Sequence, residues 1–239
     1  MAKALDWDRI DTVLCDMDGT VLDLSFDNHF WMEAIPRAWG APRGLTMDQA
    51  REALMPRFQA HRGQLHWYCI DFWSQELALD VRELKDSLSH RIDYLPGVEA
   101  ILQALREHDL HMVLLTNAHP HTLAVKERET GLLQHFDRAF STHEFGRPKE
   151  HVAFWKDFAD KTGINLSRSV LFDDTKTVLD GALAGGVGQV LAVQQPSTQE
   201  LSKMAPEEVC DPRYVKVPTL AEFPLPSRWD APVDSAPGD

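Results

Sequence analysis

The sequence predicts an α/β fold, in which helices cover both faces of a parallel sheet. Short apolar runs alternate with amphipathic helical patterns, and this alternation is typical of parallel sheets with crossover helices. The runs are rich in Val and Leu without strict polar alternation, as expected for strands that are buried on both faces. A long helical segment interrupts the alternation after the first run. Because it is too long for a loop, it predicts a small all-helical domain inserted there.

The predicted strands and helices follow from these patterns in chain order. The strands are the runs 12–15, His111–Leu115, Ser169–Phe172 and Gln189–Val193. Amphipathic spacing predicts the helices Val98–Glu107, Pro120–Glu129, Glu150–Lys161 and Thr175–Ala184. Glycines at or after the expected C-caps support the ends of the last three helices, at Gly131, Gly163 and Gly185-Gly186.

The inserted segment, residues 25–93, contains no convincing strand and has a helical, aromatic-rich pattern. Core packing of a small bundle explains most of its aromatic side chains, and one or two of them could line a pocket above the site. Its aromatic residues are Phe26, Phe30, Trp31, Trp39, Phe58, Trp67, Tyr68, Phe72 and Trp73.

Bulk composition restricts the class of protein. A length of 239 residues accommodates one large domain, or one domain and a smaller insert. The net charge of −13 argues against a nucleic-acid partner, which needs a basic face. No apolar run approaches the ~18 residues of a membrane span, and the N-terminus does not have the pattern of a signal peptide.

These absences predict a cytoplasmic protein with no membrane partner. Cys15, Cys69 and Cys210 lack the spacing of a disulfide framework or a metal motif, which agrees with a reducing compartment. The proline-rich tail, residues 224–239, is expected to be disordered or loosely attached.

Two carboxylates, Asp16 and Asp18, come directly after the first predicted strand and are followed by Gly19-Thr20. Like charges this close raise each other's pKa, so the pairing needs a compensating function. In proteins, such paired carboxylates commonly bind a divalent cation, or one of them acts as a nucleophile and the other as an acid/base. Asp16 is expected at the carboxyl edge of the sheet, where open α/β sheets bind ligands.

Polar residues also end the second and third predicted strands, as Thr116-Asn117 and Asp173-Asp174. Lys149 stands directly before a predicted helix, where an ammonium and a helix N-terminus both favour phosphate. Taken singly, these residues could be a helix cap, a turn and a solvated lysine. Because the carboxyl ends of parallel strands meet at one edge, together they predict a phosphate-handling site.

This order of motifs resembles that of the haloacid dehalogenase (HAD)-like superfamily of phosphatases. Asp16-x-Asp18-Gly19-Thr20, the strand-end Thr116, Lys149 and Asp173-Asp174 match its motifs in sequence. The resemblance implies a Rossmann-like catalytic core of residues 1–24 and 94–223. It also implies a helical cap domain of residues 25–93.

Four stretches resemble the bacterial GMP/IMP nucleotidase branch more closely: 22–31, 66–73, 115–121 and 141–146. Most superfamily members have Lys-Pro at the lysine motif, whereas here Pro148 precedes Lys149, as it does in this branch. The resemblance implies a Mg²⁺-dependent phosphatase that acts on a purine nucleoside monophosphate through an aspartyl-phosphate. The base could stack on Phe26, Trp31 or Trp67, or these rings could fill the interior of the cap.

The resemblance also assigns roles to the matching residues. Asp16 is the nucleophile and a metal ligand, and Asp18 is the acid/base and a metal ligand through its backbone carbonyl. Asp174 binds the metal, and Asp173 binds it directly or through a water molecule. Thr116, Asn117 and Lys149 are the expected phosphate-binding residues, whereas His119 and His121 are expected as helix-start residues around Pro120.

Three other functions remain open at this stage. A broad-specificity sugar-phosphate phosphatase or a phosphomutase would use the same core residues. A catalytically inactive binding domain would be expected to lack one of them, and none is missing. Relatives that dehalogenate lack the second carboxylate, so Asp18 favours a phosphate ester as substrate.

Overall fold

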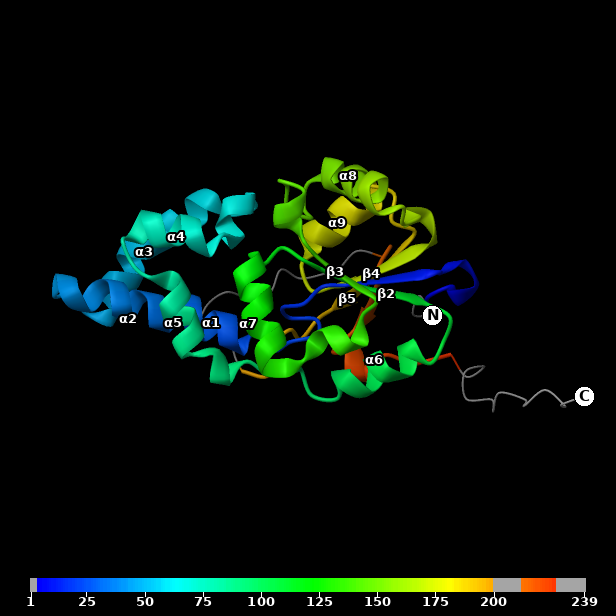
Figure 1. The fold of residues 1–239 in the computed structure, drawn as a ribbon, viewed down its shortest axis with the longest axis horizontal. Coiled ribbons are helices and arrows are strands. Elements are labelled where there is room, and N and C mark those ends of the chain that lie inside the picture. The colour runs from blue at the N-terminus through cyan, green and yellow to red at the C-terminus, as the bar shows by residue number, and fades with distance from the viewer. Residues whose placement is uncertain (1–3, 200–211, 227–239) are drawn as a thin grey trace, which may run out of the picture.

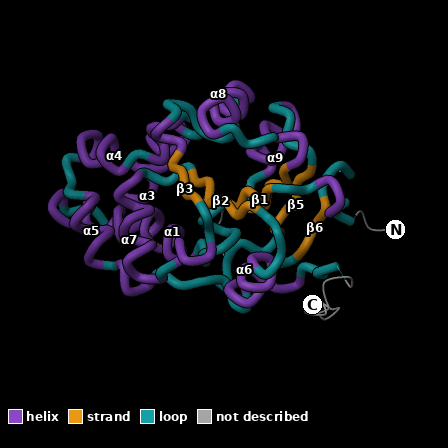
Figure 2. Tube along the Cα trace, turned by 45° about the vertical axis from the view of Figure 1, so that its right-hand side comes forward, coloured by secondary structure: helices purple, strands orange, loops and turns teal. Residues whose placement is uncertain are grey.

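A single six-stranded sheet forms the centre of the protein. The structure is a computed structural model that describes residues 4–199 and 212–226. The strands pair in the order β3-β2-β1-β4-β5-β6, and every pairing is parallel (Figures 1 and 2). Their bounds are β1 Thr12–Cys15, β2 His111–Thr116, β3 Arg138–Ser141, β4 Ser169–Asp173, β5 Gln189–Val193 and β6 Val215–Val217.

The parallel sheet is confirmed, and the four predicted strands are β1, β2, β4 and β5. The prediction of four strands was wrong in number, because β3 and β6 form the two edges of this sheet. Arg138 at the start of β3 and Lys216 in the middle of β6 are exposed. A charged residue interrupts an already short apolar run in each case, which is why neither strand has a clear sequence signal.

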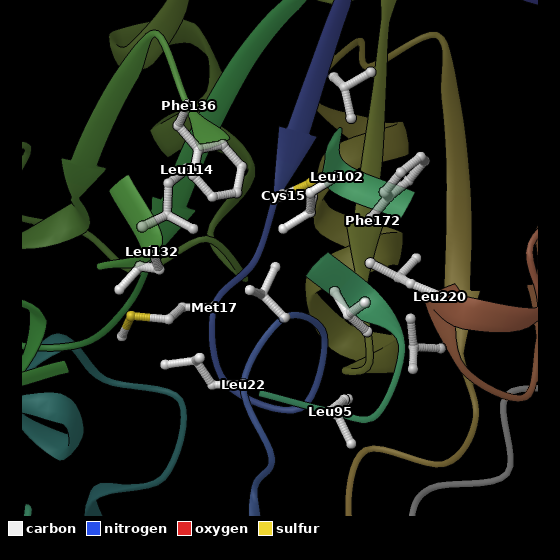
Figure 3. Close-up of a cluster of buried hydrophobic side chains, with 14 of the residues drawn as sticks. Cys15, Met17, Leu22, Leu95, Leu102, Leu114, Leu132, Phe136, Phe172 and Leu220 are labelled. Carbon is white, nitrogen blue, oxygen red and sulfur yellow. The ribbon is translucent and has the colours of Figure 1, made fainter. Parts of the chain in front are cut away.

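Helices cover both faces of the sheet, as predicted. Figure 1 shows α8 and α9 on one side of it and α6 on the other. Successive residues of β1 alternate between two separate cores, because Val13 and Cys15 pack with α6 whereas Leu14 packs with α8 and α9. Figure 3 shows the first of these cores around Cys15, Leu102 and Phe172. The helices are α6 Val98–Arg106, α7 Pro120–Thr130, α8 Val152–Thr162 and α9 Lys176–Ala184.

Residues 25–93, hereafter the insert, form helices beside the carboxyl edge of the sheet and contain no strand (Figure 1). A π-helical turn, Phe30–Ala34, joins α1 to α2 without a break in helical backbone. The insert has its own apolar cluster, which includes Phe30, Leu54 and Trp73. Its helices are α1 Ser25–His29, α2 Ile35–Gly40, α3 Met47–His61, α4 Ile70–Leu77 and α5 Val81–Ser87.

Short 3-10 helices fill several of the connections. They are Trp7–Arg9, Ala41–Arg43, Leu65–Tyr68, Ser89–Arg91, Leu132–His135, Thr142–Glu144, Leu166–Arg168 and Leu220–Glu222. The last of them packs against α6, and its Leu220 is fully buried.

The aromatic residues of the insert pack mainly on one another. The ring of Trp31 meets those of Phe58 and Trp73 edge to face, and Phe58 also meets Trp67. Phe26 is buried in the core on the α6 side of the sheet. Stacking of a nucleotide base on Phe26, Trp31 or Trp67 therefore stays a prediction.

The remaining expectations concern the cysteines, the tail and the membrane. Cys15 is completely buried, and burial raises the pKa of its thiol far above the ordinary value.

Of the predicted flexible tail, only residues 224–226 are described, and Leu225 packs partly buried against the core. Cys210 and residues 227–239 lie outside the described residues. Among the described helices, none is long and apolar enough to cross a membrane.

Candidate active site

The predicted site residues follow strands that meet at one edge of the sheet. The chain runs outwards through β1, β2 and β3, then returns to place β4 beside β1. Ligands bind at such a reversal in strand order, beyond the carboxyl ends of the strands. Cys15 of β1 pairs with Phe172 of β4, so Asp16 and Asp173 are the next residues on two neighbouring strands.

Three carboxylates and one ammonium gather at this reversal. Oxygens of Asp16, Asp173 and Asp174 lie within 4.8 Å of one another. Lys149, only 1% exposed, donates from Nζ to Asp16 Oδ1 at 2.5 Å and to Asp173 Oδ2 at 2.7 Å. The structure thus brings four of the predicted residues into one cluster, hereafter the carboxylate cluster.

The charges in the carboxylate cluster do not balance, since three carboxylates face one ammonium. Burial raises the pKa of Asp16 to about 6, although Lys149 opposes the shift. Burial, followed by the charges of Asp173 and Asp16, raises the pKa of Asp174 well above its ordinary value. Within the described part of the chain, no lysine or arginine forms an ion pair with Asp174. An all-oxygen donor set with surplus negative charge fits a hard divalent cation such as Mg²⁺.

Gly19 is required for the close approach of Asp174 to the turn after β1. Its φ is +84°, a left-handed conformation that favours glycine. A Cβ at this position would lie 2.7 Å from Asp174 Oδ2 and 2.8 Å from Pro196 Cβ. The glycine of the motif therefore has a steric reason, which is that a side chain at Gly19 would displace a candidate metal ligand.

We expect Gly19→Ala to weaken Mg²⁺ binding as well as the fold. Left-handed backbone alone costs roughly 1–2 kcal/mol for a non-glycine residue, and the collision with Asp174 adds to it. The measurement is the Mg²⁺-induced rise in melting temperature. Gly163→Ala is the matched control, because Gly163 has a φ of +77° and an added Cβ there would have no neighbouring atom within 4 Å. An equal Mg²⁺-induced rise in the two variants would contradict the steric argument.

The side chain of Asp18 belongs to a second charged group, hereafter the lysine–aspartate chain. Lys126 Nζ of α7 contacts Asp18 Oδ1 and also Asp27 Oδ2 of α1. Lys85 Nζ of α5 donates to Asp27 Oδ1 at 2.9 Å. Both lysines are 1% exposed. Two carboxylates and two ammonium groups therefore balance one another inside the protein, and they connect the core to the insert.

The lysine–aspartate chain gives its two carboxyl groups different environments. Burial raises the pKa of Asp18 to about 6 against the opposing charge of Lys126. Burial also acts to raise the pKa of Asp27, but the charges of Lys126 and Lys85 outweigh it and lower that pKa. Asp18 is thus the carboxyl group that retains a proton more readily.

Lys126, Asp27 and Lys85 were not among the predicted site residues. The spacing of four places Lys126 on the same face of α7 as Thr122, but only the structure shows that this face is buried. Nothing local distinguishes Asp27 and Lys85 from surface charges. Their pairing depends on how the insert docks on the core.

Thr116 and Asn117 lie at the end of β2, on the same edge. Thr116 is 1% exposed, and its Oγ1 accepts from the Ala118 backbone N–H at 3.0 Å. Asn117 Oδ1 accepts from the Lys149 backbone N–H at 2.9 Å, and its Nδ2 donates to Glu150 Oε2 at 2.9 Å. The Asn117 side chain therefore positions the loop that carries Lys149. Phosphate binding by Thr116, Asn117 and Lys149 stays a prediction.

The same loop also contacts the insert. Glu150 accepts at its other carboxylate oxygen from the hydroxyl of Tyr68. His119 is the N-cap of α7, as predicted, and its Nδ1 accepts from the His121 backbone N–H at 3.2 Å.

Comparisons with known proteins agree with this geometry. Residues 10–186 match the family described as haloacid dehalogenase-like hydrolase. The GMP/IMP nucleotidase YrfG of Escherichia coli (strain K12) is 38% identical over 217 residues, which cover 91% of this chain and 94% of that protein. The YrfG of Shigella flexneri matches equally.

The fold is also found in solved structures, among them these two. A HAD phosphatase from Thermococcus onnurineus superimposes with a TM-score of 0.71 at 21% identity, covering 89% of this chain and 95% of that one. A putative beta-phosphoglucomutase from Thermotoga maritima superimposes with a TM-score of 0.63 at 18% identity, covering 90% of this chain and 96% of that one. At these identities the likeness concerns the fold alone.

Proposed function

The chain belongs to the haloacid dehalogenase-like hydrolase family, and on that premise we propose that this phosphoric monoester hydrolase is a Mg²⁺-dependent purine 5′-nucleotidase acting on GMP and IMP. The 38% identity to a GMP/IMP nucleotidase supports the substrate. The separation of the two motif carboxylates into different charge environments supports the chemistry. Asp16 lies in the negatively charged carboxylate cluster, whereas Asp18 lies in the balanced lysine–aspartate chain. Two carboxyl groups in different environments suit a nucleophile and an acid/base.

Asp16 is the nucleophile in this proposal. Its carboxylate oxygen attacks the phosphorus of the nucleotide, a P–O bond forms, and the bond from phosphorus to the ribose oxygen breaks. Lys149, hydrogen-bonded to Asp16, offsets negative charge as the phosphate dianion approaches. Thr116 and nearby backbone N–H groups at the end of β2 would orient the phosphate oxygens.

Asp18 moves the proton in both halves of the reaction. Its carboxyl group donates a proton to the departing ribose oxygen, and its carboxylate then takes a proton from the attacking water. Water attack on the aspartyl-phosphate releases inorganic phosphate and regenerates Asp16. A pKa of about 6 allows both protonation states near neutral pH.

Asp16, Asp174 and the backbone carbonyl of Asp18 would hold the Mg²⁺, with Asp173 binding it directly or through water. When bound, the ion supplies charge neutralisation between the anionic nucleophile and the anionic phosphate. The contact of the Asp18 side chain with Lys126 directs that carboxylate to its proton-transfer role and leaves its backbone for the ion.

We expect purified protein with Mg²⁺ to hydrolyse GMP and IMP with a kcat/KM at least about tenfold above those for UMP and glucose phosphates, because binding contacts to the base raise kcat/KM. Phosphate release across this panel is the measurement, with the Asp16→Asn variant as the blank for contaminating phosphatases. Equal rates across the panel would indicate a broad-specificity phosphatase instead. Transfer of the phosphate to a second sugar phosphate, rather than to water, would indicate a phosphomutase.

A further inference from the structure

A second set of metal-binding side chains lies apart from the carboxylate cluster. The sulfur of Cys69, a ring nitrogen of His119 and a ring nitrogen of His143 lie within 4.8 Å of one another. These residues come from three separate segments, the N-cap of α4 in the insert, the N-cap of α7 after β2, and the 3-10 turn after β3. We propose that Cys69, His119 and His143 bind Zn²⁺ and that the ion clamps the insert onto the core.

The environment of His143 supports a ligand role. Its Nε2 is buried and has no hydrogen-bond partner among the described residues, which is costly for an imidazole unless another group satisfies it. The backbone of Asn117 lies close enough to the ring to raise its pKa against the effect of burial. Metal-binding histidines commonly donate their second nitrogen to a backbone carbonyl, which fixes the ring for the ion.

His119 lies edge to face with His143, at 5.1 Å between ring centroids. Its Nδ1 accepts from His121 at 3.2 Å, and its Nε2 is 3.5 Å from Asp71 Oδ2. Both contacts of the His119 ring are long. One ring nitrogen can therefore exchange its contact for a metal ion, while the other nitrogen keeps its polar partner. A neutral imidazole has a lone pair to donate to a metal, and both rings lie where burial disfavours the charged form.

The donor set favours zinc over magnesium. Thiolate and imidazole are the ligands of Zn²⁺, whereas Mg²⁺ prefers oxygen, as in the carboxylate cluster. Bond lengths of about 2.3 Å to sulfur and about 2.0 Å to nitrogen would set the donor atoms of a tetrahedral site roughly 3.3–3.6 Å apart, which lies within the 4.8 Å that encloses them here. Three protein ligands leave the fourth position of a tetrahedral site for water.

Occupancy has a mechanical consequence, because Cys69 is in the insert and both histidines are in the core. An ion bound to all three would hold these parts together beside Asn117, at the edge where the phosphate is expected. We therefore expect Zn²⁺ to slow substrate entry and product release.

Cobalt is the probe for this site, because tetrahedral thiolate-bound Co²⁺ has visible d–d bands and a near-ultraviolet charge-transfer band. One equivalent of Co²⁺ added to metal-free full-length protein, with excess Mg²⁺ covering the carboxylate cluster, should produce both bands. We expect Cys69→Ser to remove the charge-transfer band and His143→Gln to weaken Co²⁺ binding by at least about a hundredfold, beyond the loss typical of an indirect partner. Cys210→Ser is the control that should retain both bands.

Inhibition is the second readout. With Mg²⁺ in excess, micromolar Zn²⁺ should lower the activity of the wild type several-fold more than that of Cys69→Ser. A missing charge-transfer band, or equal bands in wild type and Cys69→Ser, would overturn the proposed site. Equal inhibition of the wild type and Cys69→Ser by Zn²⁺ would show that the ion does not act by holding the insert to the core. Cobalt binding is read without substrate, so its outcome does not depend on whether GMP and IMP are the substrates, and inhibition can be read with any phosphate ester that the protein hydrolyses.

Discussion

Asp16→Asn is expected to lower turnover by at least about a thousandfold, because the amide cannot form the aspartyl-phosphate. The measurement is phosphate release from GMP under saturating Mg²⁺. The fold should survive the change. Burial raises the pKa of Asp16 to about 6 from 3.8, so in the metal-free protein the charge on this group is less favourable in the native state than in the unfolded state.

The direction of the stability effect follows from this shift. The native state binds more protons than the unfolded state between about pH 3.8 and 6, so the Asp16 contribution to stability rises as the pH falls through this window and is unfavourable at pH 7. A neutral asparagine removes the unfavourable charge. Metal-free Asp16→Asn should therefore unfold at the same or a higher urea concentration than the wild type at pH 7.

Asp109→Asn is the matched control, because Asp109 is an exposed residue and the chemical change is the same. Its activity should equal that of the wild type. Undiminished turnover by Asp16→Asn would show that Asp16 is not the nucleophile, and it would contradict the proposed mechanism.

Lys126→Met should have the largest effect on stability among the substitutions considered. It removes the ammonium that contacts both Asp18 and Asp27 inside the protein. Breaking a buried ion pair from one side typically costs about 3–5 kcal/mol, since a charge is left without its partner. Turnover should also fall, by about tenfold or more, because Asp18 loses the group that holds it and general acid/base catalysis supplies ~10²–10⁴ in rate.

Urea denaturation and GMP kinetics measure the two effects. Lys156→Met, at an exposed position of α8, is the control and should change neither. A double-mutant cycle with Asp27→Asn isolates the ion pair, and the double variant should be more stable than the sum of the single losses predicts. Additive losses, or a stable Lys126→Met variant with full activity, would show that the lysine–aspartate chain has no such role.

The sequence was most informative where a residue's position follows from its own strand. Asp16 and Asp173 end apolar runs that form adjacent strands, so the meeting of their carboxylates could be expected from alternation alone. The edge strands escaped prediction because Arg138 and Lys216 interrupt their apolar pattern.

Contacts between the insert and the core could not be predicted in the same way. Asp27 and Lys126 are 99 positions apart, and only docking of α1 against α7 brings them together. Cys69 likewise shows no metal spacing in the sequence, because its two histidine neighbours come from loops after different strands. A helical lysine or a lone cysteine has an ordinary local pattern, and its role depends on tertiary structure.

The contact between Tyr68 and Glu150 has a consequence for the timing of the reaction cycle. If the insert swings outwards, Tyr68 leaves Glu150, the residue that also accepts from Asn117. Asn117 in turn holds the backbone of Lys149, the lysine beside Asp16, so the supports of this lysine are complete only while the insert is docked. We therefore expect phosphate transfer to be fastest in the docked conformation, and substrate entry and product release to follow undocking.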